Sequence, residues 1–119
     1  MAYPTPSPQG VLPGGSISQG TQTVTIASGV ATVVQPTGVI VLAAESGTAD
    51  TLDTLTVSDA TAGDIVVLVS DTGDTITVDD ANIDLGAATR AIAPGGSLTV
   101  RYDGTSWVEV TFLAAADNA

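Results

Sequence analysis

The sequence predicts an all-β protein: a small antiparallel β-sandwich or barrel-like domain preceded by an extended N-terminal arm. Apolar and polar residues alternate with a period of two through most of the chain, and the β-branched residues Val, Ile and Thr dominate. Turn-forming residues recur about every 8 to 12 positions, which is typical of a sandwich, a barrel or a β-helix-like stack. Near the end, two alternating runs flank Asp103 and Gly104, a strong signal of a β-hairpin because both residues tolerate a positive φ.

Residues 1–20 form the predicted arm. Proline and glycine recur throughout it and exclude a continuous helix or a central strand. Its first part, residues 3–8, favours polyproline II, an extended conformation without internal hydrogen bonds. One interpretation is a terminus without fixed structure. The other is an arm that orders on the surface of a partner, since a proline-rich segment loses less entropy on docking than a glycine-serine one.

Residues 21–113 form the predicted β-domain, and residues 114–119 a short C-terminal tail. Turn residues separate the alternating runs, as at Ser28 and Gly29 and over residues 35–38. No strand is assigned to the polar stretch 45–53. Strands are expected over residues 21–26, 30–34, 39–42, 55–57, 65–70 and 74–78, and on both sides of the hairpin turn.

Three short segments of the β-domain are similar to one another. Residues 54–57, 75–78 and 97–100 share one alternating pattern, Thr or Ser followed by Leu or Ile, Thr and Val. Their spacing of roughly twenty residues is compatible with the stacked rungs of a solenoid. Any β-domain rich in Thr and Val also produces such matches by chance, so both interpretations stay open.

The composition argues against catalysis. Histidine, cysteine and lysine are absent, so the chain has no disulfide framework, no thiolate zinc site and none of the usual nucleophile–base pairs. Carboxylate pairs are present, but they lie in turn segments, and the aromatic residues that line sugar clefts are few. We therefore expect no enzymatic activity and no cofactor.

The charge balance restricts the partners. Thirteen acidic residues face two arginines, which gives a net charge of −11. Binding to nucleic acid or to an anionic membrane needs clustered Lys and Arg, so neither is expected. We recognise no signal peptide and no spanning segment and expect a soluble protein made without export. A small core with few aromatics gains stability when one face is buried against further copies of the chain.

Two acidic turns are candidates for a cation site. Asp71 with Asp74, and Asp79 with Asp80 and Asn82, group the oxygen ligands that Ca²⁺ prefers. Neither turn has the spacing of a helix-loop-helix calcium loop. Because Asp, Asn, Thr and Gly are also the residues of tight β-turns, we favour turn formation over metal binding.

Four residues are candidates for structural or intersubunit contacts. Tyr102 and Trp107 lie beside the hairpin turn, where aromatics usually pack onto the domain or across an oligomer seam rather than form a ligand platform. Arg90 and Arg101, the two cations of the chain, are expected to contact carboxylates within the chain or between subunits.

The segment 63–110 resembles a β-module of tailed-bacteriophage virion proteins, notably capsid decoration proteins, head-fibre proteins and segments of tail fibres. The segments that carry the resemblance are residues 63–68, 74–78, 82–85 and 95–109. The most distinctive of these is the last, in which a Gly-Ser-Leu strand ends in a Tyr-Asp-Gly-Thr-x-Trp turn. The resemblance covers about two-fifths of the chain.

The resemblance implies a homotrimer that decorates the outside of a phage head. The small size favours a capsid decoration protein, made in the host cytoplasm, that cements the shell by binding the major capsid protein. The alternative is a head-fibre or tail-fibre domain that binds host-surface glycans. In the decoration reading, the arm contacts the capsid through Tyr3, Pro4, Pro6, Pro8, Val11 and Leu12.

Overall fold

The computed structural model describes residues 20–115, which form strands and no helix. This part of the chain is all-β, as predicted. The arm residues Tyr3, Pro4, Pro6, Pro8, Val11 and Leu12 lie outside the described residues, as do residues 116–119 of the tail. The strands are β1 (Thr21–Thr25), β2 (Val30–Val33), β3 (Val39–Ala43), β4 (Ala49–Leu52), β5 (Thr54–Val57), β6 (Ile65–Ser70), β7 (Thr75–Asp79), β8 (Ile83–Asp84), β9 (Thr89–Ile92), β10 (Ser97–Tyr102) and β11 (Trp107–Leu113).

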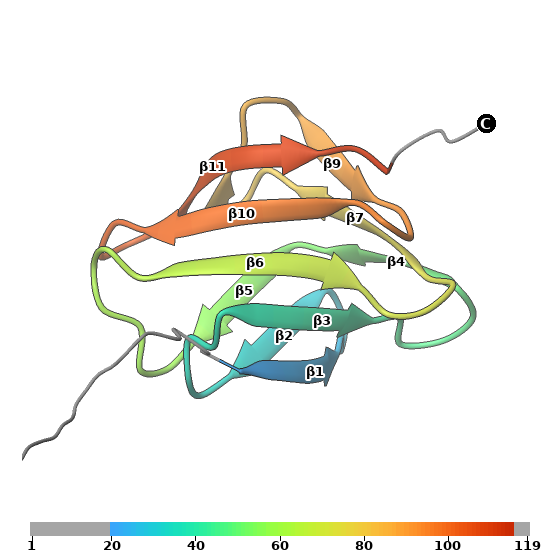
Figure 1. Ribbon diagram of the computed structural model, residues 1–119, viewed down its shortest axis with the longest axis horizontal. Helices are drawn as coiled ribbons and strands as arrows, with labels where there is room; N and C mark the ends of the chain where they lie inside the picture. Colours follow the sequence, from blue (N-terminus) through green and yellow to red (C-terminus); the bar gives the residue numbers. More distant parts are fainter. Residues whose placement is uncertain (1–19, 116–119) are drawn as a thin grey trace, which may run out of the picture.

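The strands form three sheets. Sheet A has the order β1-β3-β6-β10-β11-β8, sheet B pairs β2 with β5, and sheet C has the order β4-β7-β9. The chain passes from one sheet to the next: β3 lies in sheet A, β4 in sheet C and β5 in sheet B, and β6 then returns to sheet A beside β3. Figure 1 shows sheet A in front, with the strands of sheets B and C behind it.

Successive passes stack in parallel. In sheet A, β1 pairs with β3 and β3 with β6; β2 pairs with β5 in sheet B, and β4 with β7 in sheet C. We call each pass a rung, so that β1 and β2 form the first rung and β3 to β5 the second. The third rung starts with β6 and β7. Coiling of this kind is β-solenoid-like.

The predicted antiparallel sandwich or barrel is therefore replaced by a solenoid-like stack. A period-two pattern indicates that a strand buries one face, but it does not indicate whether the neighbouring strands run parallel or antiparallel to it. The three similar segments do not mark the rungs either. Residues 54–57 lie in sheet B, 75–78 in sheet C and 97–100 in sheet A, so the matching residues do not stack on one another.

The C-terminal strands β9 and β10 stack on the third rung in antiparallel orientation. Strand β9 pairs with β7, β10 with β6, and β11 with β10. The hairpin predicted around the Asp-Gly pair is confirmed, with Tyr102 opposite Trp107. Strands β4, β8 and β9 were not predicted. Strands β4 and β9 each bury a single apolar residue, Leu52 and Ile92, and so alternate weakly, and β8 has only two residues.

The hairpin turn differs from the expected one in its use of Asp103. Gly104 takes a positive φ of 103°, whereas Asp103 does not. Instead, its carboxylate Oδ1 accepts the backbone N–H groups of Ser106 at 2.7 Å and Thr105 at 2.8 Å. These two hydrogen bonds, together with the charge of Arg101, hold the pKa of Asp103 below its ordinary value.

The core lies between the three sheets. Every rung contributes side chains that alternate with outward ones along the strands. The largest fully buried side chains are Trp107, Ile26, Ile40, Leu42, Leu52, Leu55, Leu68, Ile76, Ile83, Ile92, Leu98 and Val66.

A side chain replaces a strand in sheet B. After β7, the chain forms β8, which pairs with β11 in sheet A and not with β5. Asn82 lies beside β5 in its place: Asn82 Oδ1 accepts the N–H of Leu55 at 3.0 Å, and Asn82 Nδ2 donates to the Leu55 carbonyl at 2.8 Å. The amide of Asn82 thus continues the backbone ladder of sheet B into the third rung.

Candidate interaction surface

The outer side of sheet A is a broad face of small apolar and hydroxyl side chains. Because Ile40, Leu42 and Leu68 point into the core, the residues between them point outward. We define face A as the outward residues of β1, β3, β6, β10 and β11. They are Thr21, Thr23, Thr25, Val39, Val41, Ala43, Ile65, Val67, Val69, Ser97, Thr99, Arg101, Val108, Val110, Thr111 and Leu113.

The strand register arranges these residues in rows across the sheet. One row runs from Val39 through Val67 and Thr99 to Thr111. The next contains Val41 opposite Val69. The centre of face A is therefore valine, with threonine on both sides.

Large apolar side chains are exposed on the same face. Among the described residues, four large hydrophobic side chains are strongly exposed, and three of them belong to face A: Ile65 (51%), Val110 (54%) and Leu113 (62%). The register spreads them over the face, since Ile65 pairs with Arg101 near one end of β10 and Leu113 pairs with Ser97 at the other.

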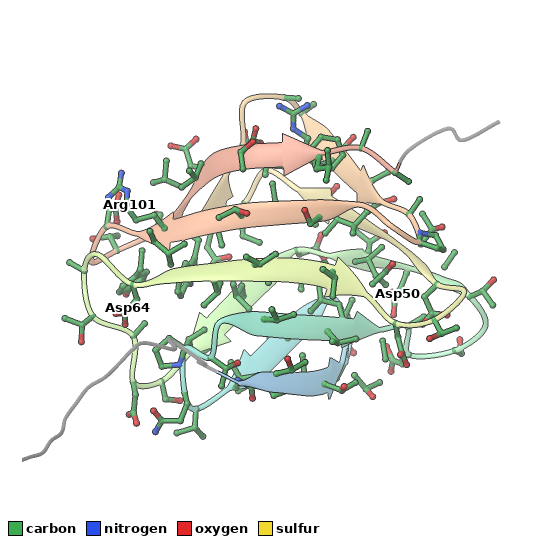
Figure 2. All side chains as sticks on the ribbon, viewed as in Figure 1. Asp50, Asp64 and Arg101 are labelled. Atoms are coloured by element: carbon green, nitrogen blue, oxygen red, sulfur yellow. The ribbon has the colours of Figure 1, made fainter. Side chains whose placement is uncertain are left out.

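Face A also differs from the rest of the molecule in charge. Its residues include no carboxylate, and Arg101 is its single charged side chain. At the border, Asp84 of β8 lies beside Val108. Figure 2 shows Asp64 near Arg101 at one end of the molecule and Asp50 at the other. Face A itself thus carries a single positive charge, and with the border carboxylates Asp64 and Asp84 the sum is −1, in a chain of net charge −11.

Acidic side chains at the corners between strands connect successive rungs. Glu45 accepts the N–H of Ser28 at 2.9 Å, and Asp74 accepts the N–H of Ala44 at 3.0 Å. Asp74 is 9% exposed, the one buried charged residue among those described. Each of these carboxylates takes a donor from the corner of the preceding rung, which is a structural role.

The candidate cation ligands likewise accept hydrogen bonds from the backbone. Asp71 Oδ1 accepts the N–H of Thr72 at 2.9 Å, and Asp80 Oδ1 accepts that of Leu85 at 3.2 Å. Within residues 20–115, no three acidic side chains come together in a group that could hold a metal ion. The contacts seen here are those of turn formation, the favoured interpretation.

Two carboxylates face each other at the corner between sheets C and B. A hydrogen bond that the protonated Asp79 carboxyl donates to Asp53, together with burial and the negative charge of Asp53, raises the pKa of Asp79 above its ordinary value. Gly29 lies over the same corner, with a φ of 82°, and a Cβ there would collide with the carboxylate of Asp53. The positive φ favours glycine at this position, and any larger residue would also have to displace the side chain of Asp53.

Arg90 forms an ion pair within the chain. Its Nε and Nη2 donate to the two carboxylate oxygens of Glu109 at 3.0 and 2.8 Å, and its guanidinium lies 4.9 Å from the ring centre of Phe112. The hydrogen bonds from Arg90, helped by the N–H of Gly86, hold the pKa of Glu109 below its ordinary value against the effect of burial. The carboxylate contact expected for Arg90 is thus intrachain.

Replacing Glu109 with glutamine should lower the melting temperature by a few degrees at neutral pH. The pKa of Glu109 is lower in the folded than in the unfolded state. The stability that its ionised carboxylate contributes is therefore fully present above the pKa of the unfolded state, near 4.5, and is lost as the pH falls through the pKa of the folded state. Thermal unfolding from neutral pH down to about pH 3 should show the wild-type and E109Q curves converging. Asp84→Asn, at an exposed site, serves as the charge-matched control. A difference that is constant with pH would contradict this role for the ion pair.

The other candidate residues have distinct environments. Trp107 is 1% exposed, and its ring centre lies 4.9 Å from that of the partly buried Tyr102, at an interplanar angle of 41°. Both aromatics pack on the core, so the structural interpretation fits them. Arg101 is exposed on face A and forms no ion pair within the described part of the chain. The intersubunit role of these residues stays a prediction.

Face A was not predicted from the sequence, although the sequence carries a signal for it. Strands β3 and β6 are continuous apolar runs, Val-Ile-Val-Leu-Ala and Ile-Val-Val-Leu-Val, rather than alternating ones. A strand of this kind has two apolar sides and is typical of sheets covered on both faces. Only the pairing of β3 with β6 shows that the two outward valine rows are neighbours.

The described residues contain no pocket and no helix long and apolar enough to cross a membrane. Comparison of the chain with protein-family models, with curated proteins and with solved structures gives no match.

Proposed function

We propose that this chain is a structural virion protein, a capsid decoration protein that binds the outer surface of a phage head and stabilises the shell as a homotrimer. The observation that carries the proposal is face A, a broad face of apolar and hydroxyl side chains without carboxylates on a strongly acidic chain. Such a face suits assembly with other protein surfaces. The resemblance of residues 63–110 to phage virion β-modules supports the choice of the phage head as the site of assembly.

The proposed mechanism is cementing. A protein that binds only the assembled, expanded shell adds its binding free energy to that state and opposes its disassembly. The proline-rich residues 1–20 supply the anchor on the major capsid protein, with Tyr3, Pro4, Pro6, Pro8, Val11 and Leu12 as the contacts. The hydrogen-bonded β-domain would form the rigid body that bridges neighbouring capsid subunits.

Deletion of residues 2–20 should abolish binding to expanded capsids and leave a folded trimer. The measurement is co-sedimentation of the purified chain with capsids that lack it, with far-UV circular dichroism and mass in solution as the test of folding. The double substitution Val11→Ser and Leu12→Ser in the full chain should weaken binding by the loss of apolar burial.

Deletion of residues 116–119 serves as the matched control and should leave binding unchanged. If the chain without residues 2–20 binds capsids with full affinity, the arm is not the anchor. If the intact chain does not bind capsids at all, the proposed function is wrong.

A further inference from the structure

We infer that face A is the surface through which this chain associates with a second copy of itself. The inference deepens the proposed function, on whose homotrimer it rests. It adds the surface and the physical basis of the contact, namely the outward valines Val39, Val41, Val67 and Val69 with the exposed Ile65.

The size and composition of face A fit such a contact. Five strands about 4.8 Å apart and about 17 Å long give a footprint on the order of 400 Å² on each copy. This is less than the roughly 800 Å² per partner of a standard stable interface, so it fits a weak, concentration-dependent association, and patches of this size on a protein surface are often functional. Interfaces between identical subunits are also more apolar than other protein surfaces, which suits the valine rows of β3 and β6.

The charge distribution selects a second copy as the occupant. Each chain has a net charge of −11, so two copies repel each other wherever their carboxylates meet. Face A is a surface on which this repulsion is weak, because the face itself has no carboxylate and its Arg101 offsets one of the two border carboxylates, Asp64 and Asp84. A basic partner would instead be attracted to the acidic corners at Glu45, Asp50 and Asp71.

An aspartate at the centre of face A should therefore separate the copies. Val67→Asp and Val41→Asp each place a charge among the valine rows, and burying it unpaired should weaken association by about 100-fold or more. Thr32→Asp and Thr56→Asp are matched controls. They add the same charge at exposed strand positions opposite each other in sheet B, and should leave association unchanged.

The readout is the mass in solution over a concentration series of the full chain, by sedimentation velocity, with circular dichroism melting of each variant. Should an aspartate variant unfold, the triple variant Val41→Thr, Val67→Thr and Val69→Thr keeps β-branched side chains of the same shape. It should still weaken association by about 10-fold through loss of apolar burial. Added salt should strengthen association of the wild type, because it screens the repulsion between acidic copies.

The inference would be overturned if the wild-type chain remained monomeric. It would also be overturned if the face A variants associated as well as the Thr32 and Thr56 controls. Dissociation on deletion of residues 2–20 alone would overturn it as well, because it would identify the arm as the occupant. Capsid binding is measured separately. If the wild type forms a dimer that the face A variants disrupt, the inference is supported but the proposed trimer is contradicted. If the chain associates with itself but does not bind capsids, only the proposed function is contradicted.

Discussion

Replacing Trp107 with alanine should lower the free energy of unfolding by about 3–5 kcal/mol. Trp107 is the one tryptophan of the chain, is 1% exposed and packs against the ring of Tyr102. Its strand also joins β8 to β10, since Trp107 pairs with Ile83 on one side and with Tyr102 on the other. Small domains are stable by only about 5–15 kcal/mol, so the variant should be close to unfolded at physiological temperature.

The measurement is urea unfolding followed by far-UV circular dichroism, because the variant has no tryptophan fluorescence. Trp107→Phe should recover more than half of the loss by refilling part of the cavity. Thr105→Ala, in the exposed part of the same hairpin, should change the midpoint little. A loss of less than about 1 kcal/mol for Trp107→Ala would show that the hairpin is not part of the core.

Replacing Asn82 with alanine should cost about 2 kcal/mol or more. Both hydrogen bonds of the Asn82 amide go to the backbone of Leu55, which is 1% exposed, and alanine would leave this donor and acceptor without their partner. The direct test is hydrogen exchange, since the amide of Leu55 should lose protection in the variant.

Two control variants separate the amide from its surroundings. Asn82→Asp keeps the acceptor for the Leu55 N–H but loses the donor to the Leu55 carbonyl, so it should retain part of the protection. Asp84→Ala, two residues further along in an exposed position, should leave the protection of Leu55 unchanged. Unchanged exchange at Leu55 in Asn82→Ala would contradict the role of this side chain as a substitute for a strand.

Most of the strands could be predicted from the sequence because each carries a local signal. The alternation in β7, where Ile76 and Val78 are buried, states which side of the strand faces inward. Asp103 and Gly104 likewise predict the hairpin between β10 and β11 from adjacent residues alone. These features depend on residues that are neighbours in the chain.

The arrangement of the strands could not be predicted in the same way. Parallel pairing of Val39 with Val67 is a contact between residues far apart in the sequence, and no turn residue marks it. Asn82 shows the same limit, because its position in a turn segment gives no sign that its amide extends sheet B. The antiparallel sandwich was the wrong inference from correct local patterns.

The candidate surface was only partly accessible from the sequence. The sparse core predicted association between copies, whereas the acidic composition opposes their approach at long range. The outward valines of β3 and β6 were part of apolar runs that looked like ordinary strands, and only their register places them on one face without carboxylates. Conversely, Trp107 and Tyr102 were identified from the sequence because aromatics beside a hairpin turn usually pack on the domain.

The number of copies of this chain in each purified phage particle tests the central claim most directly. Quantitative gel densitometry against the major capsid protein should give a count on the order of hundreds, as expected for trimers repeated over a symmetric shell. A count of a few copies to a few dozen would instead place the chain in a fibre and contradict its assignment as a decoration protein.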